Sequence, residues 1–219
     1  MQARSTPHQP QAPTASPACY LNDFGLRDGL ALYHIAADPE FFYAYLNESR
    51  QPAWLGTLRF MGLTIKARLR RPRHWFKAIR RWPNGQLLGC VVLLDIGVIA
   101  PQVGEIAYFL APSVRGAGIA TQAAISTARW AQQQFGLRGL YASVDPDNPA
   151  SLTILTRLGL SPTRFVAAAD SRFTDRAGAQ RPCWMMQTTP KSFAAALAAL
   201  PESRFPVLTG RKRPAVMAA

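Results

Sequence analysis

The chain has 219 residues, 48% of them hydrophobic, so it can bury one sizeable core and we expect a single domain. Its 25 Lys and Arg residues against 12 Asp and Glu residues give a formal net charge of +13. No run approaches 18 consecutive apolar residues, which excludes a predicted membrane span, and the three cysteines form no C-x-x-C pair, which argues against a zinc site or a disulfide framework.

The positive charge is concentrated in one part of the chain. Residues 49–94, the basic segment, contain ten Lys and Arg residues and no acid before Asp95. Such a balance fits a nucleic-acid, ribosomal or acidic protein partner, and it equally fits an arginine-rich composition without a functional role.

The two ends of the chain differ from the middle. Residues 1–18 are rich in Pro, Gln, Ser and Thr and lack the apolar stretch of a signal peptide, so we interpret them as a disordered leader. Residues 19–200 form the predicted domain, and residues 201–219 are predicted to be a flexible basic tail. We expect a soluble, cytoplasmic protein.

Hydrophobic spacing predicts the elements of the first half of the chain. They are a strand over Phe24–Ala36 with a turn at Asp28-Gly29, helices over Pro39–Leu46 and Trp54–Leu69, and a hairpin of His74–Arg81 and Gln86–Asp95. Asn84-Gly85 supplies the turn of the hairpin, because this dipeptide suits the positive φ angles of a two-residue loop.

The second half alternates between strands and helices. The predicted elements are strand Gly104–Ala111, helix Gly118–Phe135, strand Arg138–Val144, helix Pro149–Leu158, strands Ser161–Ala167 and Cys183–Thr188, and helix Lys191–Leu200. An antiparallel meander followed by alternating strands and helices predicts an α/β fold with a mixed sheet flanked by helices.

Two glycines separate a predicted strand from a predicted helix in Arg115-Gly116-Ala117-Gly118-Ile119-Ala120. Glycine reaches positive φ angles and lets a ligand approach the main chain closely. The free N–H groups and the dipole of the following helix favour an anion, so this loop is a candidate pyrophosphate site. It has neither the Lys-Ser/Thr ending of a P-loop nor G-x-G-x-x-G spacing.

A second motif, Asp145-Pro146-Asp147-Asn148-Pro149-Ala150-Ser151, lies downstream of the glycines. Asn148 is a suitable N-cap and Pro149 a suitable first helical residue, while Gly159 suits the end of a short helix. Together the two motifs resemble the GNAT superfamily of acetyl-CoA-dependent N-acetyltransferases, and the Asn-x-Ala-Ser order is similar to the branch that acetylates the N-termini of ribosomal proteins. The resemblance is clear over residues 104–166.

This resemblance implies a single-domain fold whose central sheet splays open between its fourth and fifth strands. It implies acetyl-CoA as the acyl donor, bound in that splay, and no metal. The residues it assigns to the cofactor are the main chain of Phe109 and Leu110, the loop Arg115, Gly116, Ala117, Gly118, Ile119 and Ala120, and the side chains of Asn148 and Ser151.

Three residues are candidates for acid–base chemistry. Strand alternation puts Glu105 on the face opposite Ile106 and Leu110, where it is either the base of an acceptor cleft or a solvated carboxylate. The resemblance implies that Ser151 assists the departing thiolate, although an early-helix hydroxyl is also ordinary structure. Asp170 is a second candidate base, because its spacing after Ser151 resembles that of an acidic site residue in the ribosomal-protein acetyltransferases, and a loop aspartate is the alternative.

The acceptor is expected to be a primary amine that attacks directly, without a covalent enzyme intermediate. An α-amine, with a pKa of about 7.7–8.0, is neutral far more often at neutral pH than a lysine amine at about 10.4. We therefore expect a protein N-terminus, with contact to ribosome or RNA through the basic segment. A small-molecule amine, a non-catalytic coenzyme-A-binding module and an RNA-binding protein are the alternatives, and the sequence is compatible with a monomer or a homodimer.

Overall fold

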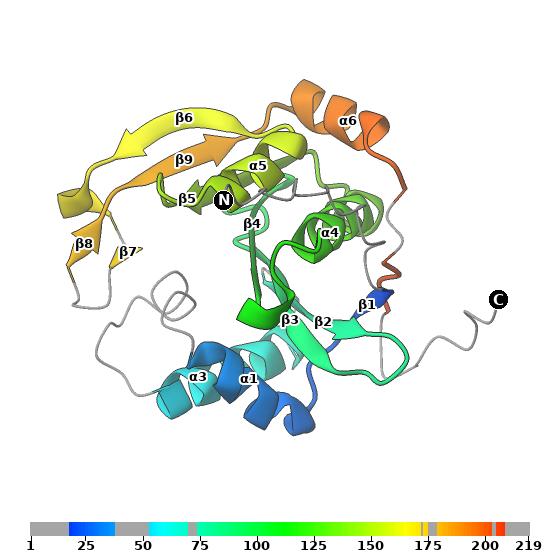
Figure 1. The fold of residues 1–219 in the computed structure, drawn as a ribbon. Helices are drawn as coiled ribbons and strands as arrows, with labels where there is room; N and C mark the ends of the chain where they lie inside the picture. The colour runs from blue at the N-terminus through cyan, green and yellow to red at the C-terminus, as the bar shows by residue number, and fades with distance from the viewer. Residues whose placement is uncertain are drawn as a thin grey trace, which may run out of the picture.

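A seven-stranded mixed sheet forms the centre of the computed structural model, which describes residues 18–37, 53–69, 74–171, 173–174, 179–202 and 205–208 (Figure 1). Across the sheet the order is β1 (Cys19–Asn22), β2 (Trp75–Arg81), β3 (Leu87–Leu94), β4 (Val103–Leu110), β5 (Gly139–Val144), β9 (Cys183–Gln187) and β6 (Ser161–Val166). A separate ribbon pairs β7 (Phe173–Thr174) with β8 (Gln180–Arg181). The pair β4–β5 is parallel, and the other neighbours are antiparallel.

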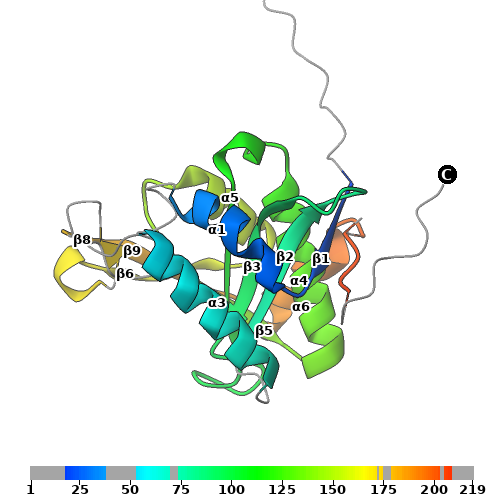
Figure 2. The same cartoon turned by 90° about the horizontal axis from the view of Figure 1, so that it is seen from below.

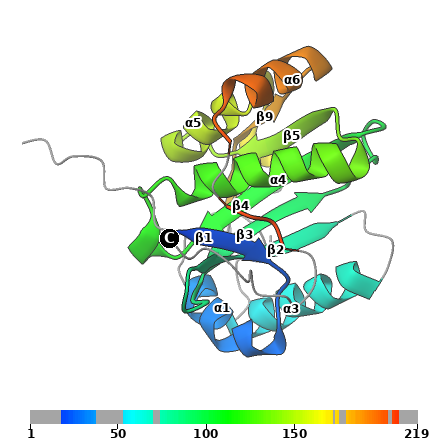
Figure 3. The same cartoon turned by 90° about the vertical axis from the view of Figure 1, so that its right-hand side faces the viewer.

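Helices cover both faces of this sheet (Figure 3). They are α1 (Gly29–Ala36), α3 (Ala53–Leu69), α4 (Ile119–Phe135), α5 (Pro149–Arg157) and α6 (Pro190–Ala199), with 3-10 turns at Leu26–Asp28, Pro112–Val114 and Ala168–Asp170. α4, α5 and α6 lie on one face, and α1 and α3 lie on the other, in front of the strands in Figure 2. The predicted α/β fold with a mixed, helix-flanked sheet is confirmed.

Each face of the sheet buries its own apolar cluster. The cluster under α4, α5 and α6 contains Ile106, Leu110, Ile119, Leu155 and Phe193, among others. The cluster under α1 and α3 contains Leu32, Phe60, Cys90 and Phe109, among others. Successive residues of β4 therefore enter opposite clusters, as the period of two in a strand requires.

The predicted first strand over Phe24–Ala36 is wrong, because most of this segment forms α1. Asp28, just before the helix, accepts a hydrogen bond from the N–H of Gly25 at 2.7 Å. Leu32 and Ile35, three residues apart, are both buried in the cluster with α3, which is helical spacing and not alternation. The first strand is β1, just upstream.

The other predicted elements from Trp54–Leu69 onward are confirmed, with ends that agree within one residue. The hairpin of β2 and β3 is present, but its turn is not the predicted two-residue loop: Gly85 has a φ of +74°, whereas Asn84 has no positive φ, and the N–H of Gly85 donates to the carbonyl of Arg81 at 2.9 Å. The short strands β7 and β8 were not predicted. The predicted helix Pro39–Leu46 lies outside the described residues.

Residues 205–208, part of the predicted basic tail, lie against β1. Phe205 is buried, and its carbonyl accepts a hydrogen bond from the hydroxyl of Ser126 at 2.8 Å. The N–H of Leu21 donates to Pro206 at 2.9 Å, and the N–H of Leu208 donates to the carbonyl of Leu21 at 2.8 Å. This segment therefore extends the β1 edge of the sheet by a short bridge. Residues 1–17 and 209–219 lie outside the described part.

Two cations of the basic segment form buried ion pairs with the region around α1. Lys77 pairs with Asp23, and the guanidinium of Arg80 contacts the carboxylate of Asp28 at 2.6 Å. Lys77 also donates to the carbonyl of Leu208 at 3.3 Å. These two side chains hold β2 to its neighbours and do not add to the positive outer surface.

Among the described helices, none combines the length and the apolar character needed to cross a bilayer. All three cysteines are free and buried. Burial raises the pKa of Cys19 to about 11, and it raises the pKa of Cys90 well above its ordinary value. Both thiols therefore stay neutral at physiological pH, as expected for packed core residues.

Candidate active site

The sheet opens between β4 and β5. These strands pair only from Val103–Gly139 to Glu105–Tyr141, whereas β4 stays paired with β3 as far as Leu110. Beyond Glu105 the two parallel strands separate, and the opening lies at their carboxyl ends. This is the position at which ligands bind in open α/β sheets.

A hydrogen bond crosses the mouth of the opening. The hydroxyl of Tyr108, on β4, donates to the main-chain carbonyl of Ser151, on α5, at 3.3 Å. Burial raises the pKa of the Tyr108 phenol well above its ordinary value, and hydrogen bonding with Ser151 opposes part of that rise. The phenol therefore stays protonated and remains a donor. Sequence reasoning missed Tyr108, because alternation places it on the same face as Ile106 without indicating its partner.

The glycine loop has the backbone that the sequence predicts. Gly116 and Gly118 have φ angles of +78° and +73°, and α4 begins directly after Gly118. A Cβ at Gly116 would meet nothing within 4 Å, so the space beside it is open in the protein. Arg115 braces the loop by donating from Nε to the carbonyl of Leu110 at 3.3 Å. The exposed loop and the N-terminus of this 17-residue helix fit a pyrophosphate group.

The N-terminus of α5 forms the other side of the opening. Asn148 caps the helix, its Oδ1 accepting from the N–H of Ser151 at 3.0 Å, and Pro149 follows as the first helical residue. The expected cap is confirmed. Phe109 and Leu110 lie at the end of β4 with both side chains buried in the core, which leaves only their main chain for a ligand.

Glu105 and Asp170 line one cavity on the opposite side of the opening, the side that carries α1 and α3. This carboxylate cavity has a volume of about 300 Å³, and Glu105 itself is only 5% exposed. It is lined by Asp95, Ile99, Glu105, Tyr141, Ser143, Arg164, Val166, Asp170, Ser171, Cys183 and Met185. The predicted face of Glu105 is therefore confirmed. Ser151 does not line this cavity and lies across the opening from it.

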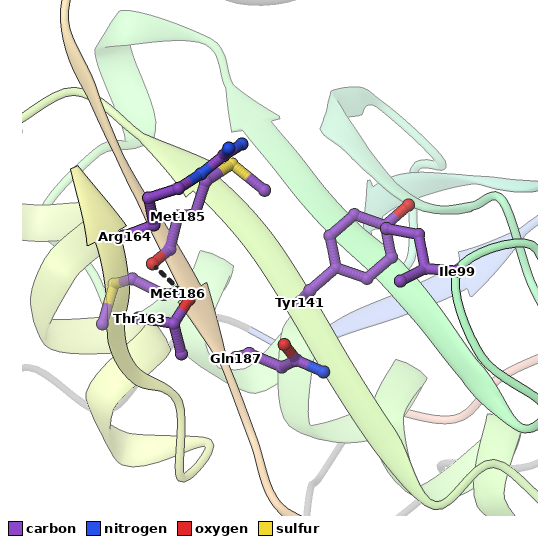
Figure 4. Close-up of a pocket in the computed structure, with 7 residues that line it drawn as sticks. All are labelled: Ile99, Tyr141, Thr163, Arg164, Met185, Met186 and Gln187. Carbon is purple, nitrogen blue, oxygen red and sulfur yellow. Dashed lines mark hydrogen bonds between the residues drawn. The ribbon is translucent and has the colours of Figure 1, made fainter. Parts of the chain in front are cut away.

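A second cavity continues along β5, β9 and β6 (Figure 4). This methionine cavity has a volume of about 200 Å³ and is lined by Ile99, Tyr141, Thr163, Arg164, Met185, Met186 and Gln187. Four of these residues, Ile99, Tyr141, Arg164 and Met185, also line the carboxylate cavity. Sequence reasoning identified none of them, because they meet only through the pairing of three strands.

Comparisons with known proteins identify this arrangement. The family model of the acetyltransferase (GNAT) domain matches residues 20–161, more than half of the chain. The chain belongs to the GNAT family. It is accordingly an acetyl-CoA-dependent N-acetyltransferase, as the sequence predicted. A search of curated protein sequences gives no match.

Solved structures with this fold include several GNAT enzymes. RimJ from Mycobacterium smegmatis, in complex with CoA-disulfide, is 20% identical with a TM-score of 0.66, over 84% of this chain and 90% of that one. Spermidine N-acetyltransferase from Vibrio cholerae, in complex with CoA and spermine, is 14% identical with a TM-score of 0.65, over 81% and 98%. Ribosomal-protein-S5-alanine acetyltransferase from Vibrio fischeri is 14% identical with a TM-score of 0.64, over 80% and 95%.

For this GNAT enzyme the donor is acetyl-CoA, and the glycine loop and the opening beside it fit that donor. Within the described residues, no group of three or more His, Cys, Asp or Glu side chains is placed to hold a metal. The structure brings Glu105 and Asp170 into one cavity, and it places Ser151 beside Tyr108 on the other side of the sheet.

Proposed function

We propose that this GNAT enzyme transfers acetyl to the α-amine of a polypeptide N-terminus. The observation that carries an amine acceptor is the carboxylate cavity, where Glu105 and Asp170 lie beside the position at which β4 and β5 separate, and the choice of an α-amine rests on its low pKa. An ammonium group that enters this cavity meets carboxylates that can hold its charge and accept its proton before attack.

In this proposal the glycine loop and the end of β4 bind the acetyl donor. Bound acetyl-CoA supplies an activated acyl group. The glycine loop from Arg115 to Ala120 holds the pyrophosphate with its N–H groups, and the main chain of Phe109 and Leu110, with Asn148, holds the pantetheine arm.

Proton transfer is divided between the two faces of the sheet. Glu105 is the proposed base, and Asp170 orients the amine in the same cavity. Ser151 donates to the departing thiolate, a light task because a thiol with a pKa near 8.5 needs little acid assistance at neutral pH. Tyr108 acts only through Ser151, by holding its carbonyl.

An α-amine suits this cavity better than a lysine side chain. Its pKa of about 7.7–8.0 lets a carboxylate deprotonate it at a modest free-energy cost, whereas a lysine amine at about 10.4 needs a stronger base. The structural likeness to a ribosomal-protein-S5-alanine acetyltransferase supports a protein acceptor.

A small polyamine is the second candidate. The likeness to a spermidine N-acetyltransferase and the three carboxylates of Asp95, Glu105 and Asp170 favour it. These carboxylates would bind any primary ammonium, however, so they do not separate the two candidates.

The proposal includes contact with the ribosome or RNA through the basic segment. Lys77 and Arg80 are committed to buried ion pairs, so in the described part of that segment the exposed cations Arg59 and Lys66, both on α3, support this contact.

The experiment is to locate the acetyl group on a peptide that offers both amines. A peptide with an N-terminal alanine and one internal lysine is incubated with acetyl-CoA and the enzyme, and the product is fragmented in a mass spectrometer. The proposal expects acetyl on the α-amine. Acetyl on the lysine, or none on the peptide while spermidine is acetylated, would contradict it.

A further inference from the structure

The carboxylate cavity and the methionine cavity form one groove with two unlike ends. They share Ile99, Tyr141, Arg164 and Met185. Asp95, Glu105 and Asp170 line only the first cavity, and none of the described residues that line the second is acidic. An acceptor that spans the groove therefore meets carboxylates in the first cavity, and it meets mainly uncharged side chains in the second.

Among the described residues that line either cavity, Arg164 is the one cation. In Figure 4 its guanidinium lies next to the thioether of Met185, across the space from Tyr141 and Ile99. Within the described part of the chain, the Arg164 side chain takes part in no hydrogen bond or ion pair.

Other arginines of the domain differ in this respect. Arg80 contacts Asp28, and Arg181 contacts Asp147 at 2.6 Å and Asp145 at 3.4 Å. Arg164 thus keeps five N–H donors available on a rigid plane whose geometry matches a carboxylate.

Strand pairing gives the spacing between Glu105, in the carboxylate cavity, and Arg164, which lies where the two cavities meet. Glu105 pairs with Tyr141 on β5, and Ser143, two residues further along β5, pairs with Met185, which pairs with Arg164 on β6. Three strand spacings of about 4.8 Å and two residues along the strand put the Cα atoms of Glu105 and Arg164 roughly 16 Å apart. Both side chains reach inward, so the remaining span is that of two to three residues of extended peptide at about 3.3 Å each.

We propose that the groove selects polypeptide N-termini that carry Asp or Glu at the second or third residue, and that Arg164 binds that carboxylate. This inference rests on the proposed function and names its substrate class. The α-ammonium lies among the carboxylates, the first residues cross Tyr141 and Met185, and the acidic side chain meets the free guanidinium. A polyamine would place a second ammonium against Arg164, so the same residue disfavours it.

The test uses three peptides that share an N-terminal alanine and carry aspartate, asparagine or lysine at the second and third positions. For the full-length enzyme we expect KM to rise in that order, by about fivefold or more from aspartate to asparagine, as for a charge-assisted hydrogen bond at a partly exposed site. The preference should weaken as ionic strength rises from about 0.05 to 0.3 M.

Variants of Arg164 test whether this residue causes the preference for the aspartate peptide. Arg164→Gln should level the KM values of the aspartate and asparagine peptides, and Arg164→Glu should reverse the order in favour of lysine. Arg157→Glu makes the same charge change at an exposed position on α5, across the sheet, and should keep the wild-type order. The value of kcat for the asparagine peptide should change less than threefold in Arg157→Glu, the control.

The outcomes separate this inference from the proposed function. If the wild-type enzyme acetylates all three α-amines with equal KM, or if Arg164→Gln keeps the aspartate preference, the role of Arg164 is wrong and the polypeptide acceptor stands. If no peptide is acetylated and spermidine is, both proposals fall.

Discussion

The phenol of Tyr108 donates to the main-chain carbonyl of Ser151 at 3.3 Å and so joins β4 to α5 at the point where β4 has lost its pairing with β5. The bond links the two elements between which we propose that acetyl-CoA binds. It also fixes the first turn of α5, on which the Ser151 hydroxyl is carried.

Removing this hydroxyl should disturb Ser151 without emptying the site. We expect Tyr108→Phe to lower kcat about three- to tenfold, and to lower the free energy of unfolding by about 0.5–1.5 kcal/mol, as for loss of one hydrogen bond. Thiol-release kinetics and urea unfolding measure the two effects. Tyr33→Phe, at a part-exposed position on α1, is the control. Equal kcat values in the two variants would show that the bond has no role in turnover.

The glycine loop offers a matched pair of substitutions. Gly116 and Gly97 have similar positive φ angles, +78° and +74°, and a Cβ at either position meets nothing within 4 Å in the protein. Gly116→Ala and Gly97→Ala therefore carry the same backbone strain, about 1–2 kcal/mol. Only Gly116 lies where the pyrophosphate is expected, so calorimetry should show acetyl-CoA affinity reduced tenfold or more in Gly116→Ala alone. Gly118→Val should abolish binding while circular dichroism shows a folded protein. Equal affinities across these variants would contradict the assignment of the loop.

Acid–base catalysis predicts losses in turnover and not in donor binding. We expect Glu105→Gln to lower kcat by about a hundredfold or more, within the range for a general base, and to leave acetyl-CoA affinity unchanged. Glu202→Gln removes an exposed carboxylate far along the chain and serves as the control. A loss below threefold for Glu105→Gln, together with a large loss for Asp170→Asn, would transfer the role of base to Asp170.

Ser151→Ala tests the other face of the sheet. Because the leaving thiol needs little assistance at neutral pH, we expect a smaller loss of kcat than for Glu105→Gln, about tenfold, again without loss of acetyl-CoA affinity. Turnover equal to that of the wild-type enzyme would reduce Ser151 to a helix residue capped by Asn148.

Most of the fold could be predicted from the sequence, because its elements are marked by local motifs. Turn glycines, the Asn148 cap and strand periodicity act over a few residues, and every α-helix and strand from α3 onward except the ribbon β7–β8 follows from them. The segment Phe24–Ala36 was misread because its helix depends on distant partners: Asp28 contacts Arg80, and Leu32 packs with Phe60. Such contacts between distant segments form only in the tertiary structure, so the sequence around Phe24–Ala36 carries no local pattern that predicts the helix.

Part of the candidate site could also be predicted from the sequence, and part could not. Strand alternation is enough to assign the face of Glu105, and the resemblance to a family supplies Asp170 and Ser151. Tyr108 and Arg164 could not be predicted, because the first acts through an element more than forty residues away and the second enters the groove only through the register of β6 on β9.

The most direct test of the central claim is the rate of free-thiol release from acetyl-CoA by the wild-type enzyme with three acceptors at equal concentration. These are a peptide with a free N-terminal alanine and one internal lysine, the same peptide with its N-terminus blocked, and spermidine. We predict release with the free peptide, at most background with the blocked peptide, and a lower kcat/KM for spermidine. Faster release with spermidine, or equal release from the free and blocked peptides, would contradict the assignment of a polypeptide α-amine as the acceptor.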